Sequence, residues 1–211
     1  MIQGLLLQMP GLLLGISVHE MAHGYMAYRK GDYTAKMMGR ITLNPARHID
    51  PVGTVLVPIM LALSGLPVFG WAKPVPVSTF NFKSPRKDNA IVSLAGPASN
   101  FLLAIVLAFM LKILLLIANP GSIVTPLSQM LYYGVYISVI LGVLNLIPIS
   151  PLDGSHIVTG ILPAHQAQVY SRHERYGFII LLVLIFTGIL WRIIGPVSRG
   201  IFYAITGIIG L

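Results

Sequence analysis

Long apolar segments separated by short polar ones make up most of this 211-residue chain. About 20 apolar residues cross a bilayer as a helix, because each residue adds 1.5 Å to a span of roughly 30 Å. The longer apolar segments cover residues 2–28, 90–118, 130–147 and 176–194, and the shorter ones cover 52–69, 157–162 and 196–211. The pattern predicts an all-α polytopic membrane protein with about four to six transmembrane helices. We expect a single membrane-embedded domain over residues 1–211, with a core at about 1–154 and C-terminal helices at about 157–211.

Basic residues are distributed unevenly between the polar loops. No Lys or Arg precedes the first apolar segment, whereas the loop after it contains Arg29, Lys30, Lys36, Arg40 and Arg47. Cytoplasmic loops of membrane proteins are enriched in Lys and Arg. We therefore expect a protein of the cytoplasmic membrane, with its N-terminus outside and the loop at 29–50 in the cytoplasm.

The segment at 52–77 is predicted to enter the membrane and return. The loops before and after it, at 29–50 and 81–88, are both basic and so are expected on the same side. Pro74 and Pro76 exclude a helix interior or a central strand, so residues 69–77 are predicted to return as an extended edge strand. The alternative is an ordinary span with one loop that departs from the charge rule.

Composition supports the membrane assignment and excludes several other classes. Hydrophobic residues make up 55% of the chain, charged residues 9%, and the mean hydropathy is +0.82. Soluble domains carry roughly 25% charged residues. The formal net charge of +8 lies in the polar loops, which indicates contact with anionic lipid and not with nucleic acid. The chain has no cysteine, so a thiolate metal site and disulfides are excluded.

The first apolar segment contains an H-E-x-x-H motif, His19-Glu20-Met21-Ala22-His23. Two histidines at i and i+4 lie about 6 Å apart on one helix face, close enough to share a metal ion. Glu20 is placed to take a proton from a metal-bound water. By the rise of the helix, the pair is expected roughly 10 Å inside the cytoplasmic face.

Asp153 is the candidate for a third ligand. The predicted span at 90–118 runs outward and the one at 130–147 runs inward, which brings Asp153 to the side and depth of the histidine pair. A catalytic zinc site uses three protein ligands and leaves one position for water. Pro148 and Pro151 are expected to end the helix there, and Gly154 to let the backbone turn sharply.

These motifs resemble the site-2 protease family of intramembrane zinc metalloproteases. The resemblance rests on four elements that occur in the family order. They are His19-Glu20-x-x-His23, Phe69-Gly-Trp-Ala-Lys-Pro-Val-Pro-Val77, Gly96-Pro97-x-x-Asn100 and Asn145-x-x-Pro148-x-x-Pro151-Leu-Asp153-Gly154. The chain is similar to the compact subtype, which lacks attached PDZ and CBS modules. Ser155-His156 departs from the family pattern and leaves the role of His156 open.

The resemblance implies one Zn²⁺ per chain, held by His19, His23 and Asp153, with Glu20 as general base. The implied substrates are transmembrane segments of other proteins, cut within or near the bilayer. A helical peptide bond is shielded by its own turn, so the substrate must unwind locally before cleavage. An exposed edge strand is able to capture the unwound peptide by β-addition.

Six residues are candidates for substrate contact, and each also has a structural interpretation. The candidates are Gly70, Trp71, Ala72 and Lys73 in the predicted edge strand, together with Asn100 and Asn145. Either asparagine is able to hydrogen-bond the substrate backbone or the oxyanion, or to form an ordinary interhelical bond. Trp71 serves equally well as an interfacial anchor. His48, in a polar loop, is expected to be solvated.

Two other function classes remain open from the sequence. An ion or metal transporter would also place His and Asp inside the membrane, although transporters commonly contain paired broken segments and no internal repeat is visible here. A catalytically inactive relative would bind membrane proteins without cutting them, although Glu20 is the residue that such a relative is free to lose.

Overall fold

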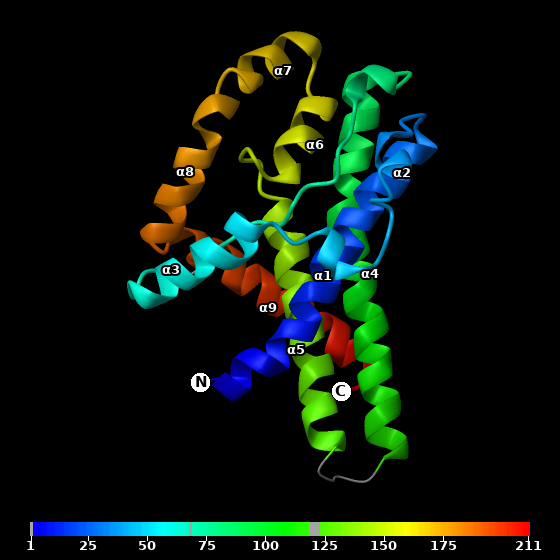
Figure 1. The fold of residues 1–211 in the computed structure, drawn as a ribbon, viewed down its shortest axis with the longest axis vertical. Helices are drawn as coiled ribbons and strands as arrows, with labels where there is room; N and C mark the ends of the chain where they lie inside the picture. The colour runs from blue at the N-terminus through cyan, green and yellow to red at the C-terminus, as the bar shows by residue number, and fades with distance from the viewer. Residues whose placement is uncertain (1, 68, 119–122) are drawn as a thin grey trace.

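The computed structural model describes residues 2–67, 69–118 and 123–211, and these residues form an all-α protein (Figure 1). No β-strand occurs in these ranges. The α-helices are α1 (Ile2–Arg29), α2 (Thr34–Met37), α3 (Val57–Leu63), α4 (Pro85–Ile117), α5 (Val124–Asn145), α6 (Asp153–Ile161), α7 (Ala164–Ser171), α8 (Glu174–Phe186) and α9 (Ile189–Ile209). Two 3₁₀ turns, η1 (Pro45–Arg47) and η3 (Thr79–Asn81), and a π-helical turn, η2 (Pro51–Leu56), lie in the segment between α1 and α4.

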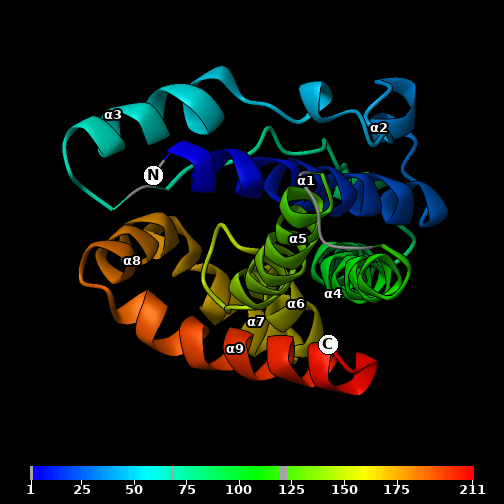
Figure 2. The same cartoon turned by 90° about the horizontal axis from the view of Figure 1, so that it is seen from below.

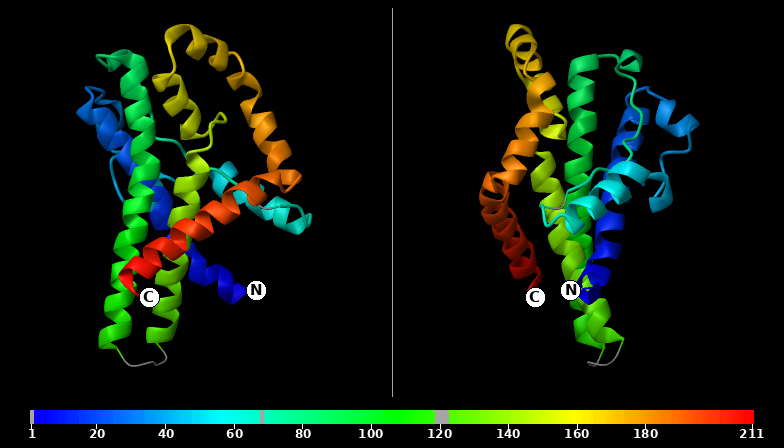
Figure 3. Two further views of the ribbon diagram at one scale, coloured as in Figure 1. Left: turned by 180° about the vertical axis from the view of Figure 1, so that it is seen from behind. Right: turned by 60° about the vertical axis from the view of Figure 1, so that its left-hand side comes forward.

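Two long helices, α4 and α5, lie side by side at the centre of the molecule (Figures 1 and 3). Helix α1 packs against both of them on one face, and α9 crosses them on the other (Figure 3). Seen from below, α1 lies between the segment that contains α2 and α3 and the α4–α5 pair (Figure 2). The fold is therefore layered, with α1 as an inner layer.

Small residues bring α1 close to α5. A Cβ atom on Gly11 would lie 2.6 Å from the Cα atom of Gly134, and one on Gly15 would lie 2.9 Å from the Leu141 side chain. In the membrane, helices associate through such close packing because lipid provides no hydrophobic driving force between them. These glycines set the position of α1, the helix that contains the H-E-x-x-H motif.

Two or three candidate membrane spans occur in the described residues by length and apolar composition. Helices α4 and α5 qualify, and the pair α8 and α9, bent by 79° at its break, counts as a third if it is one broken span. This number is smaller than the four to six expected. The apolar helix at Pro51–Leu63 is shorter than the roughly 20 residues that a span needs. Helix α1 is 28 residues long but carries Gln, His and Glu among its apolar residues.

Residues 69–78, which we call the strap, begin beside η2 and the start of α3, where Gly70 lies against Gly53 and Pro58, and cross toward the start of α4 (Figure 1). The prediction of a β-strand here was wrong, because the strap has no regular strand partner among the described residues. The N–H groups of Trp71 and Lys73 instead donate to the carbonyls of Gly53 (3.1 Å) and His48 (2.9 Å). The chain thus reverses and comes back against the loop from which it departed. Re-entry of this segment into the bilayer stays a prediction.

Candidate metal centre

The two motif histidines lie on the face of α1 that packs against α4. Both are 8% exposed, and their Nε2 atoms are 3.0 Å apart. The imidazole rings meet edge to face, with ring centroids 4.5 Å apart. Both features follow from the i, i+4 spacing of His19 and His23 on a continuous helix.

Asp153 reaches the histidines from the other half of the chain, as the sequence predicts. Helix α5 ends at Asn145, and α6 begins at Asp153, so the carboxylate lies at the first residue of a new helix. Gly154 does not have a positive φ, so its task at this turn is not a left-handed backbone conformation. A Cβ atom there would lie 2.4 Å from the carbonyl oxygens of Leu146 and Ile147, so glycine is required for close approach.

The three side chains form a compact set of metal ligands. Asp153 Oδ2 lies 3.1 Å from His19 Nε2 and 3.2 Å from His23 Nε2. Neighbouring ligands of a tetrahedral zinc ion with bonds of about 2.0–2.1 Å are separated by about 3.3 Å, so the triangle of 3.0, 3.1 and 3.2 Å fits zinc closely. Asp153 Oδ2 is buried and accepts no hydrogen bond in the described part of the chain, as expected for an atom that binds a cation. These are the only three His, Asp or Glu residues that the described ranges bring together in this way.

One row of residues on α4 contacts both imidazoles. The carbonyl of Val92 lies 2.8 Å from His23 Nδ1, and the side-chain amide nitrogen of Asn100 lies 3.1 Å from His19 Nδ1. Between them, a Cβ atom on Gly96 would lie 2.4 Å from His23 Nε2 and 2.6 Å from His19 Cε1. Positions 92, 96 and 100 share a face because they are four residues apart, and they match positions 23 and 19 because the helices are antiparallel.

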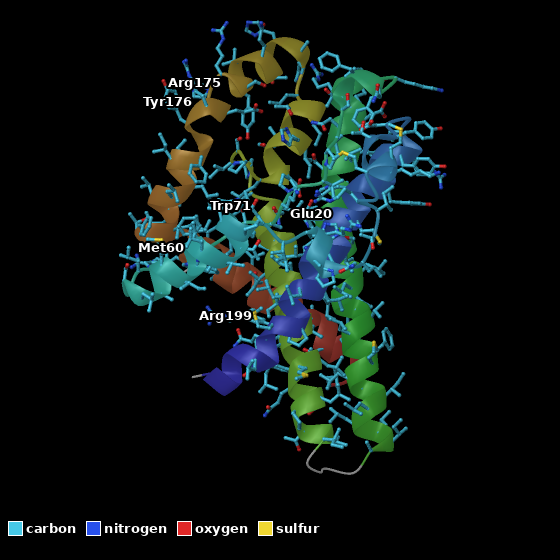
Figure 4. The ribbon with its side chains drawn as sticks, viewed as in Figure 1. Glu20, Met60, Trp71, Arg175, Tyr176 and Arg199 are labelled. Atoms are coloured by element: carbon cyan, nitrogen blue, oxygen red, sulfur yellow. The ribbon has the colours of Figure 1, made fainter. Side chains whose placement is uncertain are left out.

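Glu20 lies next to the ligands on α1 and is held by the strap. The backbone N–H of Val75 donates to Glu20 Oε2 at 2.8 Å. Glu20 is half-buried, while Val75 is 8% exposed. Figure 4 shows Glu20 near the middle of the molecule, with Trp71 at nearly the same level. The strap therefore positions one oxygen of the predicted general base.

The strap is itself fixed by buried polar groups that the sequence did not single out. The Arg40 guanidinium donates to the carbonyls of Lys73 (2.8 Å) and Pro74 (3.3 Å). Asp32, which is fully buried, accepts from Ser78 N–H at 2.7 Å. It also accepts from Asn81 Nδ2 and from the backbone and hydroxyl groups of Thr34. Arg40 and Asp32 thus hold the backbone of the strap in place.

The candidate substrate residues divide into an exposed group and a buried one. Gly70, Trp71 and Lys73 are exposed on the strap, and Ala72 is half-buried. The Trp71 indole, 43% exposed, lies against Gly53, where a Cβ atom would be 2.2 Å from the ring. The strap therefore presents these four residues at the surface of the molecule.

The two asparagines, His48 and His156 occupy different environments. Asn100 is fully buried and contacts a metal-ligand candidate. Asn145 donates to the Leu141 carbonyl of its own helix at 3.0 Å. His48 is 1% exposed, so its expected solvation was wrong, and its Nε2 lies 2.9 Å from the Thr42 carbonyl. His156 is half-buried on α6.

Gly96 and Val92 are the site residues that sequence reasoning missed. Gly96 belongs to the Gly96-Pro97-x-x-Asn100 element, so a signal was present, but its task of making room for two rings depends on the crossing of α1 and α4. Val92 contacts His23 through its backbone carbonyl, so its side-chain type in the sequence gives no signal of this role.

A family model and the most similar curated proteins indicate the same family for this chain. The family model described as "Peptidase family M50" matches residues 9–124 and 111–188. "Putative zinc metalloprotease YwhC" of Bacillus subtilis is 39% identical over 178 residues, covering 83% of this chain and 78% of that protein. "Putative zinc metalloprotease Rip2" of Mycolicibacterium smegmatis is 32% identical over 192 residues, covering 89% of this chain and 69% of that protein. No solved structure matches the chain.

Proposed function

Since the chain belongs to peptidase family M50, the site-2 protease family, we propose that it is a zinc-dependent intramembrane endopeptidase. Its substrates are transmembrane segments of other membrane proteins, hydrolysed within or near the bilayer. The observation that carries this proposal is the convergence of His19, His23 and Asp153 beside Glu20, with ligand atoms 3.0–3.2 Å apart. The relatives, named as zinc metalloproteases, support the same chemistry.

The ligand set suits hydrolysis because it contains three protein side chains and leaves one position open. Zinc bound there supplies a Lewis acid that polarises the scissile carbonyl and lowers the pKa of an attacking water to about 7. Glu20 takes the proton from that water and passes it to the leaving amine. The Val75 N–H donates to Glu20 Oε2 and keeps the carboxylate in place, while Glu20 Oε1 accepts and releases the proton.

The strap is the proposed place where the unwound substrate binds as an added strand. In extended backbone, successive N–H groups point to opposite edges. The N–H groups of Trp71, Lys73 and Val75 all point inward to partners in this protein. On the opposite edge, the prolines at 74 and 76 have no N–H group, so Gly70 and Ala72 supply the donors that remain for a substrate.

The proposed location is the cytoplasmic membrane, with the N-terminus outside and the metal site near the cytoplasmic face. The basic loop at 29–50 supports this orientation. Water then reaches the metal site from the cytoplasm. The partners are a transmembrane protein substrate and the lipid bilayer.

The test is a cleavage assay with purified protein and a panel of single-span membrane proteins. Glu20→Gln keeps the size of the side chain and removes the base, so we expect cleavage to fall by at least about 100-fold while zinc content is unchanged. Glu174→Gln, at the only other glutamate of the chain, is the matched control and is expected to cleave like wild type. Equal cleavage by wild type and Glu20→Gln would refute the proposal.

A further inference from the structure

One buried polar atom beside the metal centre has no partner. Asn100 is fully buried, and its Oδ1 atom makes no hydrogen bond within the described residues. The other end of the same amide, Nδ2, lies 3.1 Å from His19 Nδ1. A buried polar group without a partner is rare and calls for a physical explanation.

His23 shows what the metal site requires of its histidines. Its Nδ1 atom lies 2.8 Å from the Val92 carbonyl, which can only accept a hydrogen bond. Nδ1 of His23 therefore carries the proton, and the lone pair of Nε2 points toward Asp153 and His19, where a metal ion binds. One backbone carbonyl thus sets the tautomer of this ligand.

His19 needs the same arrangement, because its Nε2 atom also belongs to the ligand triangle. A lone pair on Nε2 places the proton of the neutral ring on Nδ1. An Nδ1–H group needs an acceptor, whereas the amide nitrogen of Asn100 is a donor. His19 Nδ1–H and the Asn100 amide form a hydrogen bond only if Asn100 Oδ1, and not Nδ2, lies against Nδ1.

We propose that Asn100 is a positioning residue for zinc, whose side-chain Oδ1 accepts a hydrogen bond from His19 Nδ1–H and so directs His19 Nε2 to the metal. A half-turn about the Cβ–Cγ bond exchanges Oδ1 and Nδ2 without moving the rest of the side chain. This exchange places the unpartnered oxygen against Nδ1 at the distance now occupied by nitrogen. Asn100 then acts on His19 as the Val92 carbonyl acts on His23.

This role replaces the substrate contact expected for Asn100. The side chain is fully buried and faces the ring of a ligand, so it does not touch a peptide in the open position of the metal. The inference depends on the zinc site and not on the proposed proteolysis. The two are therefore tested by different measurements.

The first test measures Zn²⁺ affinity by competition with a chromophoric chelator, on full-length protein in detergent. Asn100→Ala removes the acceptor, and we expect 10- to 100-fold weaker binding, the usual effect of losing such a partner. Asn100→Asp keeps an acceptor of the same shape and is expected to bind Zn²⁺ at least as tightly as wild type. Ser99→Ala is the matched control, because Ser99 lies beside Asn100 on α4 and bonds to the Gly96 carbonyl (2.7 Å); its affinity should stay within about threefold of wild type.

The second test needs no substitution and remains informative if a variant fails to fold. Long-range ¹H–¹⁵N correlation spectra of zinc-loaded protein with ¹⁵N-labelled histidine distinguish protonated Nδ1 from protonated Nε2. We expect His19 to carry its proton on Nδ1, with Nε2 bound to zinc. Far-ultraviolet circular dichroism of each variant checks that its helices are intact.

Three results would overturn the proposal. They are wild-type zinc affinity in Asn100→Ala, a folded Asn100→Asp that is as weak as Asn100→Ala, and a proton on Nε2 of zinc-bound His19. If the expected pattern appears but no membrane protein is cut, the role of Asn100 stands and the protease proposal fails. If substrates are cut and Asn100→Ala binds zinc as tightly as wild type, the protease proposal stands and the role of Asn100 fails.

Discussion

Replacing Gly96 by alanine is expected to displace both histidine ligands. The added Cβ atom would lie 2.4 Å from His23 Nε2, 2.5 Å from His23 Cε1 and 2.6 Å from His19 Cε1. The rings have little freedom to move aside, because their Nδ1 atoms are held by Val92 and Asn100. The clash therefore falls on the metal centre and not on a flexible side-chain end.

The size of the effect follows from the displacement that is needed. Ordinary contact begins at 3.4 Å, so each ring must move by roughly 1 Å, whereas metal–ligand distances tolerate only about 0.2 Å. We expect Zn²⁺ affinity to fall by at least about 100-fold, or about 2.7 kcal/mol. Helix propensity acts in the opposite direction, since alanine is about 1 kcal/mol better than glycine in a helix interior.

The assay is the same chelator competition, together with thermal unfolding of each variant. Gly200→Ala is one control, because a Cβ atom at that helical position meets nothing within 4 Å; its zinc affinity should be unchanged. Gly142→Ala is the second, since the three atoms nearest its Cβ atom would all belong to the Phe101 ring, at 2.9–3.1 Å, so the substitution disturbs helix packing and not a metal ligand. Zinc affinity of Gly96→Ala within about threefold of wild type would refute the steric reasoning.

Two further predictions concern the strap. Burial alone would raise the pKa of the Asp32 carboxyl, but hydrogen bonds such as that from Ser78 N–H outweigh burial and hold the pKa below its ordinary 3.8. The ionised form therefore stabilises the fold above about pH 4, and this contribution is lost as the pH falls through the lower pKa of the folded state. Asp32→Asn should remove that part of the pH dependence of thermal unfolding, and an unchanged slope between about pH 2 and 5 would contradict it. Ala72→Pro removes an N–H group from the free edge of the strap, so we expect at least tenfold slower cleavage with unchanged zinc content. Pro76→Ala adds an N–H group to that edge and should cleave at least as fast as wild type. Normal cleavage by Ala72→Pro would exclude strand addition at this edge.

The ligand pair was predictable because its geometry is local. Two histidines four residues apart meet on any continuous helix, whatever surrounds it. Asp153 lies 130 residues further on, and it was predicted from the positive charge of the loops together with the Pro148-x-x-Pro151-Leu-Asp153-Gly154 context. The membrane topology behind that argument stays a prediction. The all-α class followed from the long apolar segments in the same way.

The strap shows where a local pattern misled. The alternation around two prolines is typical of an edge strand, but a strand exists only with a partner of regular register. Here the inward N–H groups of the strap donate in turn to the carbonyl of Gly53 in η2, to the carbonyl of His48 and to the Glu20 carboxylate. Those acceptors come from three separate places in the chain, so no local pattern encodes them.

The sequence by itself determined the helical class, the zinc-binding residue types and the two ligands that share a helix face, because these depend on composition and on periodicity within one element. Only the tertiary structure decided that Asn100 faces His19, that Gly96 makes room for two rings and that His48 is buried. Each of these depends on how closely and at what register two helices or loops pack, and that is a property of the pair and not of either sequence segment alone.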